Sequence, residues 1–257
     1  MKSDDPAETA ARLVNFLQNG FSKAGFSRAT IGMSGGVDSA TAAALTVRAL
    51  GAESVYPALL PYGALSTEGV LDAMTAVTAF GIPLSNVTRI DIAKAVDAVT
   101  GSGPTDQLRR GNVMARIRMV YIFDQAKKRN SLVVGTENRS EHLLGYYTRF
   151  GDEGSDIEPL RGLYKTEVYA LARAIGVPES IVTKLPTAGL WAGQTDEGEL
   201  GFDYASADRI LEMVIDRNQT PDEVVAAGIA GELVTKVLQR VKENDFKHRL
   251  PIIPDRL

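Results

Sequence analysis

The stretch Gly32-Met-Ser-Gly-Gly-Val-Asp-Ser-Ala40 decides the fold of this 257-residue chain. It begins in a short apolar run, residues 29–33, and leads into an alanine-rich stretch with helical periodicity, residues 38–50. The sequence therefore predicts a strand, a glycine turn and a helix in direct succession. Because the amides of such a turn point into one concavity and the helix N-terminus adds a positive dipole, we expect the turn to hold phosphate groups.

The turn differs from the two commonest phosphate-binding loops. It lacks the lysine of the GxxxxGK(S/T) loop and the third glycine of GxGxxG. It carries Ser34, Ser39 and an acid, Asp38, at the start of the helix instead. An acid beside phosphates is unfavourable unless a cation lies between them, so Asp38 indicates Mg²⁺. The alternative is a structural turn in which Asp38 only favours the helix N-terminus.

Strands and helices alternate on both sides of this turn. Strands are predicted over residues 29–33, 54–60, 86–90 and 131–135, and helices over residues 7–19, 38–50, 67–80 and 106–128. After Lys165 the pattern is helical, over residues 166–175, 178–184, 205–217 and 231–244, before a proline-punctuated tail at 250–257. Strands that alternate with helices are typical of βαβ units. The chain is therefore predicted to be α/β, with a doubly wound, mostly parallel sheet, helices on both faces and a helical C-terminal region.

The composition excludes several classes of protein. Hydrophobic residues make up 44% of the chain and charged residues 23%, which suffices for a sizeable core. The net charge of −4 gives no footprint for nucleic acid or a membrane surface. The chain has no cysteine, which excludes disulfides, thiolate metal sites and a cysteine nucleophile. No apolar run approaches the length of a membrane span, and the polar start is unlike a signal peptide, so we expect a cytoplasmic protein.

A second polar segment, Gly135-Thr-Glu-Asn-Arg-Ser-Glu141, follows the strand predicted over residues 131–135. Ligands of open parallel sheets bind at the carboxyl ends of strands, where the first turn also lies. Glu141 is therefore a candidate to join Asp38 on Mg²⁺. The alternative is that Thr136 and Glu141 cap a short helix.

Two further segments carry candidate binding residues. Lys165 stands at the start of a predicted helix, where the dipole disfavours a cation unless a bound anion such as an ATP phosphate reverses the preference. A plain surface lysine is the alternative. On the helix predicted over residues 106–128, one stripe is polar and includes Arg116, while an apolar stripe is formed by Val113, Ile117 and Val120. The polar stripe either faces a ligand or is solvated.

The Ser34–Ser39 pattern resembles the pyrophosphate loop of the N-type ATP pyrophosphatases. Taken in order, the segments above most closely resemble the ammonia-dependent NAD synthetases. The stretches Gly111-Asn-Val-Met-Ala-Arg-Ile-Arg-Met119 and Pro186-Thr-Ala-Gly-Leu-Trp-Ala-Gly-Gln-Thr-Asp-Glu197 extend the resemblance over nearly the whole chain. Residues 159–178 also resemble GMP synthetases, whereas residues 135–156 and 188–201 single out NAD synthetases.

The resemblance implies an adenine nucleotide alpha hydrolase-like fold and a carbon–nitrogen ligase. The implied reaction is ATP-dependent amidation of nicotinic acid adenine dinucleotide to NAD⁺ by ammonia, through an acyl-adenylate, with release of AMP and pyrophosphate. It also implies Mg²⁺, a homodimer and one synthetase domain over residues 1–257 with no glutaminase domain, whose usual nucleophile is the cysteine that this chain lacks. The alternatives are a free-standing GMP synthetase subunit and a non-catalytic nucleotide-binding protein.

The resemblance also implies a role for each matching position. ATP would be contacted by Gly32, Met33, Ser34, Gly35, Gly36, Val37, Asp38, Ser39, Thr136, Lys165 and Thr187. The dinucleotide would be contacted by Arg116, Arg149, Asp156 and Lys247. Asp38 and Glu141 would bind Mg²⁺, and Asp38 and Lys165 would be catalytic.

The chain departs from the family pattern at four positions. Arg149 stands where the family usually has lysine, and Phe246 precedes Lys247 where the family tends to have histidine. Leu59 and Leu65 occupy places where many bacterial members have arginine and glutamine. These departures leave open how the substrates are contacted at those points.

Overall fold

The computed structural model describes residues 5–101 and 105–248, and the tail predicted at 250–257 lies outside these ranges. Within them, four parallel strands form one sheet in the order β3-β2-β1-β4. The strands are β1 (Ala29–Gly32), β2 (Val55–Leu59), β3 (Thr88–Arg89) and β4 (Leu132–Val134). Ala29 of β1 lies opposite Val55 on one side and Leu132 on the other, so β1, β2 and β4 end at one edge of the sheet.

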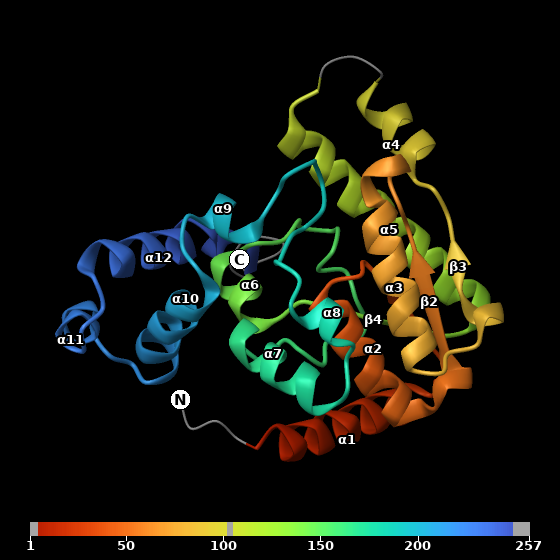
Figure 1. Cartoon of the computed structure of the whole chain (residues 1–257), viewed down its shortest axis with the longest axis horizontal. Helices are drawn as coiled ribbons and strands as arrows, with labels where there is room; N and C mark the ends of the chain where they lie inside the picture. Colours follow the sequence, from red (N-terminus) through yellow and green to blue (C-terminus); the bar gives the residue numbers. More distant parts are fainter. Residues whose placement is uncertain (1–4, 102–104, 249–257) are drawn as a thin grey trace, which may run out of the picture.

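Helices cover both faces of this sheet, as the doubly wound prediction requires (Figure 1). The first seven are α1 (Pro6–Ala24), α2 (Val37–Leu50), α3 (Thr67–Ala79), α4 (Ala93–Thr100), α5 (Gln107–Arg129), α6 (Arg139–Leu144) and α7 (Lys165–Ala174). Ile31 and Leu59 pack with α1, α2, α3 and α7 in one core, whereas Ala58 packs with α4 and α5 in another. Successive strand residues point to opposite faces, so the short strands serve two cores.

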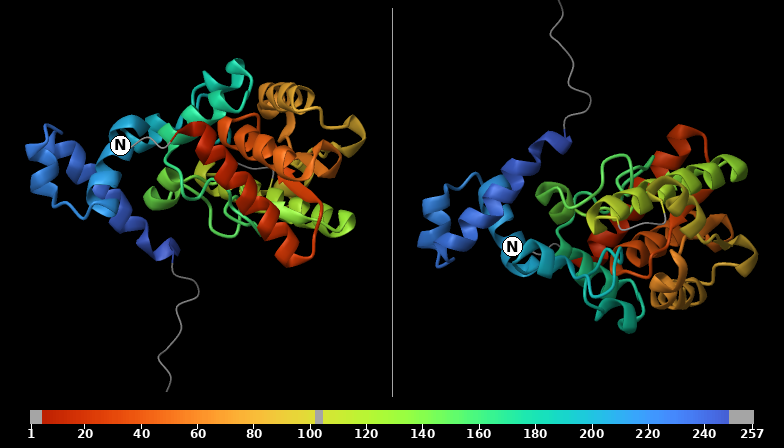
Figure 2. Two further views of the ribbon diagram at one scale, coloured as in Figure 1. Left: turned by 90° about the horizontal axis from the view of Figure 1, so that it is seen from below. Right: turned by 90° about the horizontal axis from the view of Figure 1, so that it is seen from above.

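The C-terminal region is helical, as predicted. It comprises α8 (Glu179–Val182), α9 (Asp196–Leu200), α10 (Tyr204–Leu211), a π-helical turn at Glu212–Asp216, α11 (Pro221–Ala226) and α12 (Gly231–Asn244). The helices α10 to α12 extend to one side of the sheet and its covering helices (Figure 2). They share a core with Leu144 and Tyr164, which flank α6 and α7.

Several predicted boundaries are wrong for identifiable reasons. Helix α1 continues through Gly20 to Ala24. Gly20 does not end the helix but allows close packing, because a side chain there would lie 2.5 Å from Ile157. The helix ends at Gly25, whose φ of 75° favours glycine. The helix predicted over 205–217 changes to π geometry after Leu211. Short helices such as α4 and α9 were missed because they span too few residues for a periodic signal.

In the described part of the chain, no helix combines the length and the apolar character needed to cross a membrane.

Candidate functional site

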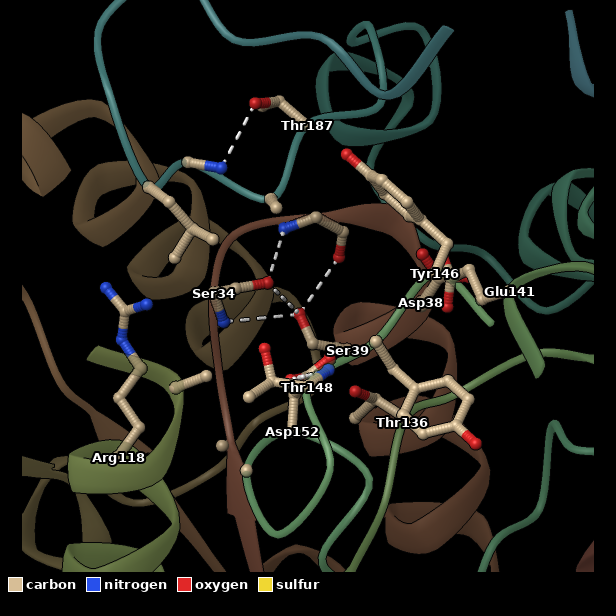
Figure 3. A pocket seen from close by; sticks show the side chains of 18 of the residues that line it. Ser34, Asp38, Ser39, Arg118, Thr136, Glu141, Tyr146, Thr148, Asp152 and Thr187 are labelled. Atoms are coloured by element: carbon tan, nitrogen blue, oxygen red, sulfur yellow. Dashed lines mark hydrogen bonds between the residues drawn. The ribbon is translucent and has the colours of Figure 1, made fainter. Parts of the chain in front are cut away.

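The carboxyl ends of β1, β2 and β4 open into a cavity of about 1110 Å³, which α5, the loop after α6 and the segment before α9 also line. Figure 3 shows the side chains that point into it. The cavity is lined by all but one of the candidate residues: Gly32, Met33, Ser34, Gly35, Gly36, Val37, Asp38, Ser39, Arg116, Thr136, Glu141, Arg149, Lys165, Thr187 and Lys247. The residues that the sequence singled out therefore gather around one cavity, with Asp156 as the exception.

The glycine turn is held by hydrogen bonds among its own residues. The Ser34 and Ser39 hydroxyls lie 3.2 Å apart, and Ser34 accepts a hydrogen bond from the Gly36 amide at 3.2 Å (Figure 3). Gly35 has a φ of 86°, and a side chain there would lie 2.4 Å from the Gly69 carbonyl at the start of α3. Glycine is required at this position by both the backbone conformation and the close approach of α3.

Helix α2 begins at Val37, with Gly36 as its N-cap and no side-chain cap. Asp38 lies in the first turn, where an acid is favoured by the helix dipole, but its side chain makes no capping hydrogen bond. The first amides of a helix have no partner within it. Val37, Asp38 and Ser39 all line the cavity, so this turn offers amides and a positive dipole end to an anion.

A buried ion cluster lies beside this helix end. The Lys165 ammonium is 2.5 Å from Asp38 Oδ2 and 3.0 Å from Glu141 Oε1, and Lys165 is only 2% exposed. Asn138 donates its side-chain amide to Asp38 Oδ1 at 2.9 Å. The two carboxylates predicted to meet at the sheet edge therefore do meet, with a lysine between them.

The charges in this cluster depend on each other. Burial alone would lower the pKa of Lys165, but neighbouring carboxylates, Asp38 first, outweigh burial and hold that pKa well above its usual value. Burial raises the pKa of Glu141, and the Lys165 ammonium acts in the opposite direction. The lysine is thus a fixed positive charge that keeps two crowded carboxylates compatible.

Glu141 also has the capping role considered as its alternative. Asn138 is the N-cap of α6, and its side chain accepts from the Glu141 amide at 3.0 Å. The Glu141 carboxylate accepts a hydrogen bond from the Asn138 backbone amide at 3.4 Å through Oε2. This capping bond leaves Glu141 Oε1 to contact Lys165. Glu141 therefore caps α6 and belongs to the ion cluster at the same time.

Asp208 supports this cluster and was missed by sequence reasoning. It is 1% exposed, and it accepts from the Ser140 hydroxyl at 2.5 Å and from the Thr166 amide at 2.9 Å. The Ser140 hydroxyl in turn accepts from the Lys165 amide at 2.8 Å. Asp208, on α10, therefore joins the N-terminal turns of α6 and α7, which carry Glu141 and Lys165. An acid among the apolar residues of a helical pattern was the only signal in the sequence, and it does not show which partners the acid would have.

The opposite wall carries the residues expected to contact a dinucleotide. Arg116 on α5 donates Nε to the Arg149 carbonyl at 3.2 Å. The Arg149 guanidinium lies 5.1 Å from the ring centre of Phe246, so these two departures from the family pattern face each other. Lys247 donates to the carbonyls of Gly145 and Tyr147 at 2.5 and 3.0 Å, which ties the chain end to this loop.

The structure corrects or refines three expectations from the sequence, which concern Asp156, the pair Leu59 and Leu65, and Val120. Asp156 does not line the cavity, because its carboxylate accepts from the Val133 amide of β4 at 2.7 Å. Leu59 is a core residue at 1% exposure, whereas Leu65 does line the cavity. Val120 does not belong to a packed apolar stripe, because it is 56% exposed while Val113 and Ile117 pack in the core under α5.

Arg118 and Asp152 were also missed. Arg118 lines the cavity and donates Nε to the Leu60 carbonyl at 3.1 Å, and no described residue accepts from its terminal nitrogens. Burial lowers the pKa of Arg118 to about 10, against the opposing charge of Asp152. Asp152 remains open to the cavity but is surrounded by protein, which raises its pKa to about 6. Arg118 and Asp152 thus add a cation and an acid to the lining, and Figure 3 draws Arg118 on the side away from Asp38 and Glu141.

The chain is similar in sequence and in structure to several known proteins. The family model for NAD synthase matches residues 9–251. The NH(3)-dependent NAD(+) synthetase of Chlorobium phaeobacteroides is 42% identical over 242 residues, which are 94% of this chain and 86% of that protein. The structure of NMN synthetase from Francisella tularensis superposes with a TM-score of 0.85 at 31% identity, over 98% of this chain and 100% of that one. The NH3-dependent NAD synthetase from Campylobacter jejuni gives a TM-score of 0.81 at 30% identity, with the same coverage.

Proposed function

This chain belongs to the NAD synthase family, and we propose that it amidates nicotinic acid adenine dinucleotide to NAD⁺ with ATP and ammonia. The observation that carries this proposal is the buried cluster of Lys165, Asp38 and Glu141 beside the first turn of α2, in a cavity of about 1110 Å³. A sensor or structural protein has no need of this set of charges.

The reaction needs a carboxylate to attack the α-phosphorus of ATP. The bond from the α-phosphorus to the bridging oxygen breaks, pyrophosphate leaves, and ammonia then attacks the acyl carbon of the adenylate and expels AMP. The first-turn amides of α2 and the Lys165 ammonium would neutralise the phosphates and align them for in-line attack. Asp152, open to the cavity, would accept the proton that the attacking nitrogen loses.

Magnesium fits the same cluster. Asp38 and Glu141 already hold one cation between two carboxylate oxygens, and oxygen ligands are those that Mg²⁺ prefers. Among the residues described, no group of three acidic or histidine side chains is arranged to hold a metal alone. Mg²⁺ is commonly held by one or two carboxylates and completed by substrate phosphates, so Asp38 and Glu141 would hold it together with ATP. The metal would supply charge neutralisation to the leaving pyrophosphate.

The dinucleotide would lie on the α5 wall, held by Arg116 and Arg149. Lys247 would shape this wall through the loop that it binds. Asp156 does not line the cavity, and we propose that it would reach a substrate only across an interface between two copies of the chain.

A homodimer is part of this proposal. Val120 and Phe123, three residues apart on α5, are 56% and 36% exposed, and Phe150 in the loop after α6 is 58% exposed. Exposed apolar side chains that gather on one face favour burial against a partner. A second copy would cover them beside the substrate wall, where Gly154 packs against Met119 of the same helix.

A second candidate substrate is nicotinic acid mononucleotide, which the likeness to an NMN synthetase structure favours. Purified protein should be incubated with ATP, Mg²⁺ and ammonium, and separately with each of three acceptors: the dinucleotide, the mononucleotide and xanthosine monophosphate. We expect pyrophosphate and NAD⁺ with the dinucleotide. Preference for another acceptor would overturn the substrate assignment. Glutamine should not replace ammonium, since we propose a single synthetase domain without a glutaminase domain.

A further inference from the structure

We propose that Lys165 and the divalent cation compete for one pair of carboxylate oxygens. The cation can displace the Lys165 ammonium only when nucleotide phosphates are present to accept that ammonium. This inference rests on the proposed function and assigns Lys165 a second role, as the internal counter-ion of the metal site before the substrate arrives.

The four carboxylate oxygens of Asp38 and Glu141 fall into two pairs with different partners. Asp38 Oδ1 and Glu141 Oε2 each accept a hydrogen bond from Asn138, through its side-chain amide and its backbone amide. The two remaining oxygens, Asp38 Oδ2 and Glu141 Oε1, both contact the Lys165 ammonium. The oxygens that face each other, and that a bridging cation would use, are therefore the ones that lysine occupies.

The positive charges of Lys165 and of the metal oppose their binding at the same time. With both carboxylates ionised, they and the ammonium carry a net charge of −1, and Lys165 is 2% exposed, so water screens their interactions weakly. A divalent cation bound about 2 Å from the same oxygens would stand next to the ammonium without intervening water. The repulsion between these two positive groups makes simultaneous occupancy unfavourable. Lys165 must move before the metal binds.

The Lys165 ammonium needs another acceptor when it leaves the two carboxylates. The backbone of Lys165 is fixed by Ser140, so only the side chain can move. Asp196 is the next acid nearby, but its oxygens accept from the hydroxyls of Tyr146 and Tyr204, each at 3.2 Å. The remaining acceptor is a ligand anion at the first turn of α2, where Asp38 itself lies. Metal and nucleotide should therefore reinforce each other's binding by way of Lys165.

The test measures binding of Mn²⁺ alone, in place of Mg²⁺, by electron paramagnetic resonance of the full-length protein without nucleotide. Wild type should bind Mn²⁺ weakly, and Lys165→Gln at least about tenfold more tightly, because the competitor is gone. Lys165→Arg, which keeps the positive charge, should bind as weakly as wild type. Equal or weaker Mn²⁺ binding by Lys165→Gln would overturn the proposal.

Lys184→Gln is the matched control. Lys184 also lines the cavity and contacts two carboxylates, Asp72 at 2.6 Å and Glu68 at 3.2 Å. Its removal changes the net charge by the same amount, but Glu68 is 81% exposed to solvent, so no buried pair of carboxylates is left behind. The affinity of Lys184→Gln for Mn²⁺ should therefore stay at the wild-type value. A gain equal to that of Lys165→Gln would mean that general charge, and not competition at one site, governs the binding, and would overturn the proposal.

Two further measurements separate the possible failures. Lys165→Gln leaves two crowded carboxylates, so its melting temperature should rise on addition of Mn²⁺ while that of wild type stays constant. A variant that Mn²⁺ neither folds nor stabilises contradicts the proposal. Wild type should also form a ternary complex with Mn²⁺ and α,β-methylene ATP. Failure of that complex would instead overturn the assigned metal and ATP site.

Discussion

At the scale of single residues, Asp38 shows how one side chain acquires its role from its neighbours. It lies in the first turn of α2 without capping it, and its two oxygens are held by Asn138 and Lys165. Its side chain is 16% exposed, so it is not the open surface acid that a glycine turn suggests. Its position between a helix N-terminus and a buried lysine suits an acid that presents a metal to phosphates.

We predict that Asp38→Asn lowers the rate of adenylation at least about 100-fold, because the amide keeps the shape but loses the charge that would hold the metal. Pyrophosphate release measures the rate, and circular dichroism should show an unchanged fold. Asp72→Asn breaks a comparable ion pair with Lys184 at the same cavity and serves as the control. Similar losses in both variants would contradict a metal-binding role specific to Asp38.

Glu158 carries a prediction about pH. Burial raises its pKa to about 7, against smaller opposing effects from Ser155 and Arg161, and no described residue donates to its Oε2. The folded protein therefore retains a proton that the unfolded chain has released between the usual glutamate pKa and about pH 7. Stability contributed by this group is present at low pH and is lost as the pH rises through that window.

Glu158→Gln should remove this dependence. Its melting temperature should exceed that of wild type at pH 8, and the difference should shrink towards pH 5. Thermal unfolding followed by circular dichroism at both pH values checks the prediction. A difference that does not vary with pH would show that the wild-type carboxyl is ionised throughout the range.

At the scale of elements, the N-terminal turns of α6 and α7 bring Glu141 and Lys165 together. Asp208 on α10 joins these two turns through Ser140 and Thr166. A helix end whose amides are satisfied by a buried acid is fixed in position. The C-terminal helices thus hold the geometry of a site that lies at the edge of the sheet.

Asp208→Asn should lower kcat while leaving the KM for ATP nearly unchanged, because it disturbs the alignment of Lys165 without contacting substrate. An amide must turn a donor towards either Ser140 or Thr166, so unfolding should also become easier by about 1–3 kcal/mol. Asp203→Asn, at the exposed N-cap of α10, keeps its capping bond and should behave like wild type. A pure loss of stability with unchanged kcat would contradict the positioning role.

The elements also show how far sequence reasoning reaches. The strand, turn and helix around Gly35 were predictable because the apolar run, the glycines and the alanine-rich helix are all local signals. The meeting of Asp38 and Glu141 followed from a general rule about strand ends. Arg118 and Asp208 were not predictable, because their partners lie far away in the chain and only the packing of α5 and α10 brings them into place.

At the scale of the whole molecule, the cavity lies between the sheet edge and the C-terminal helices, while the outer side of α5 remains exposed. We predict that Val120→Asp converts a dimer to a monomer in light scattering, because a charge opposes burial of this apolar face. Leu71→Asp places the same charge on a leucine of α3 that is 64% exposed and should leave the dimer intact. A monomeric wild type would refute the dimer.

The acyl-adenylate is the central claim, and the fate of the nicotinate oxygens tests it most directly. The dinucleotide should be labelled with ¹⁸O in its carboxylate and converted with ATP and ammonium, and the products examined by mass spectrometry. Attack on the α-phosphorus predicts one ¹⁸O in AMP and one retained in the amide of NAD⁺. Label in inorganic phosphate, with ADP as the nucleotide product, would contradict the account.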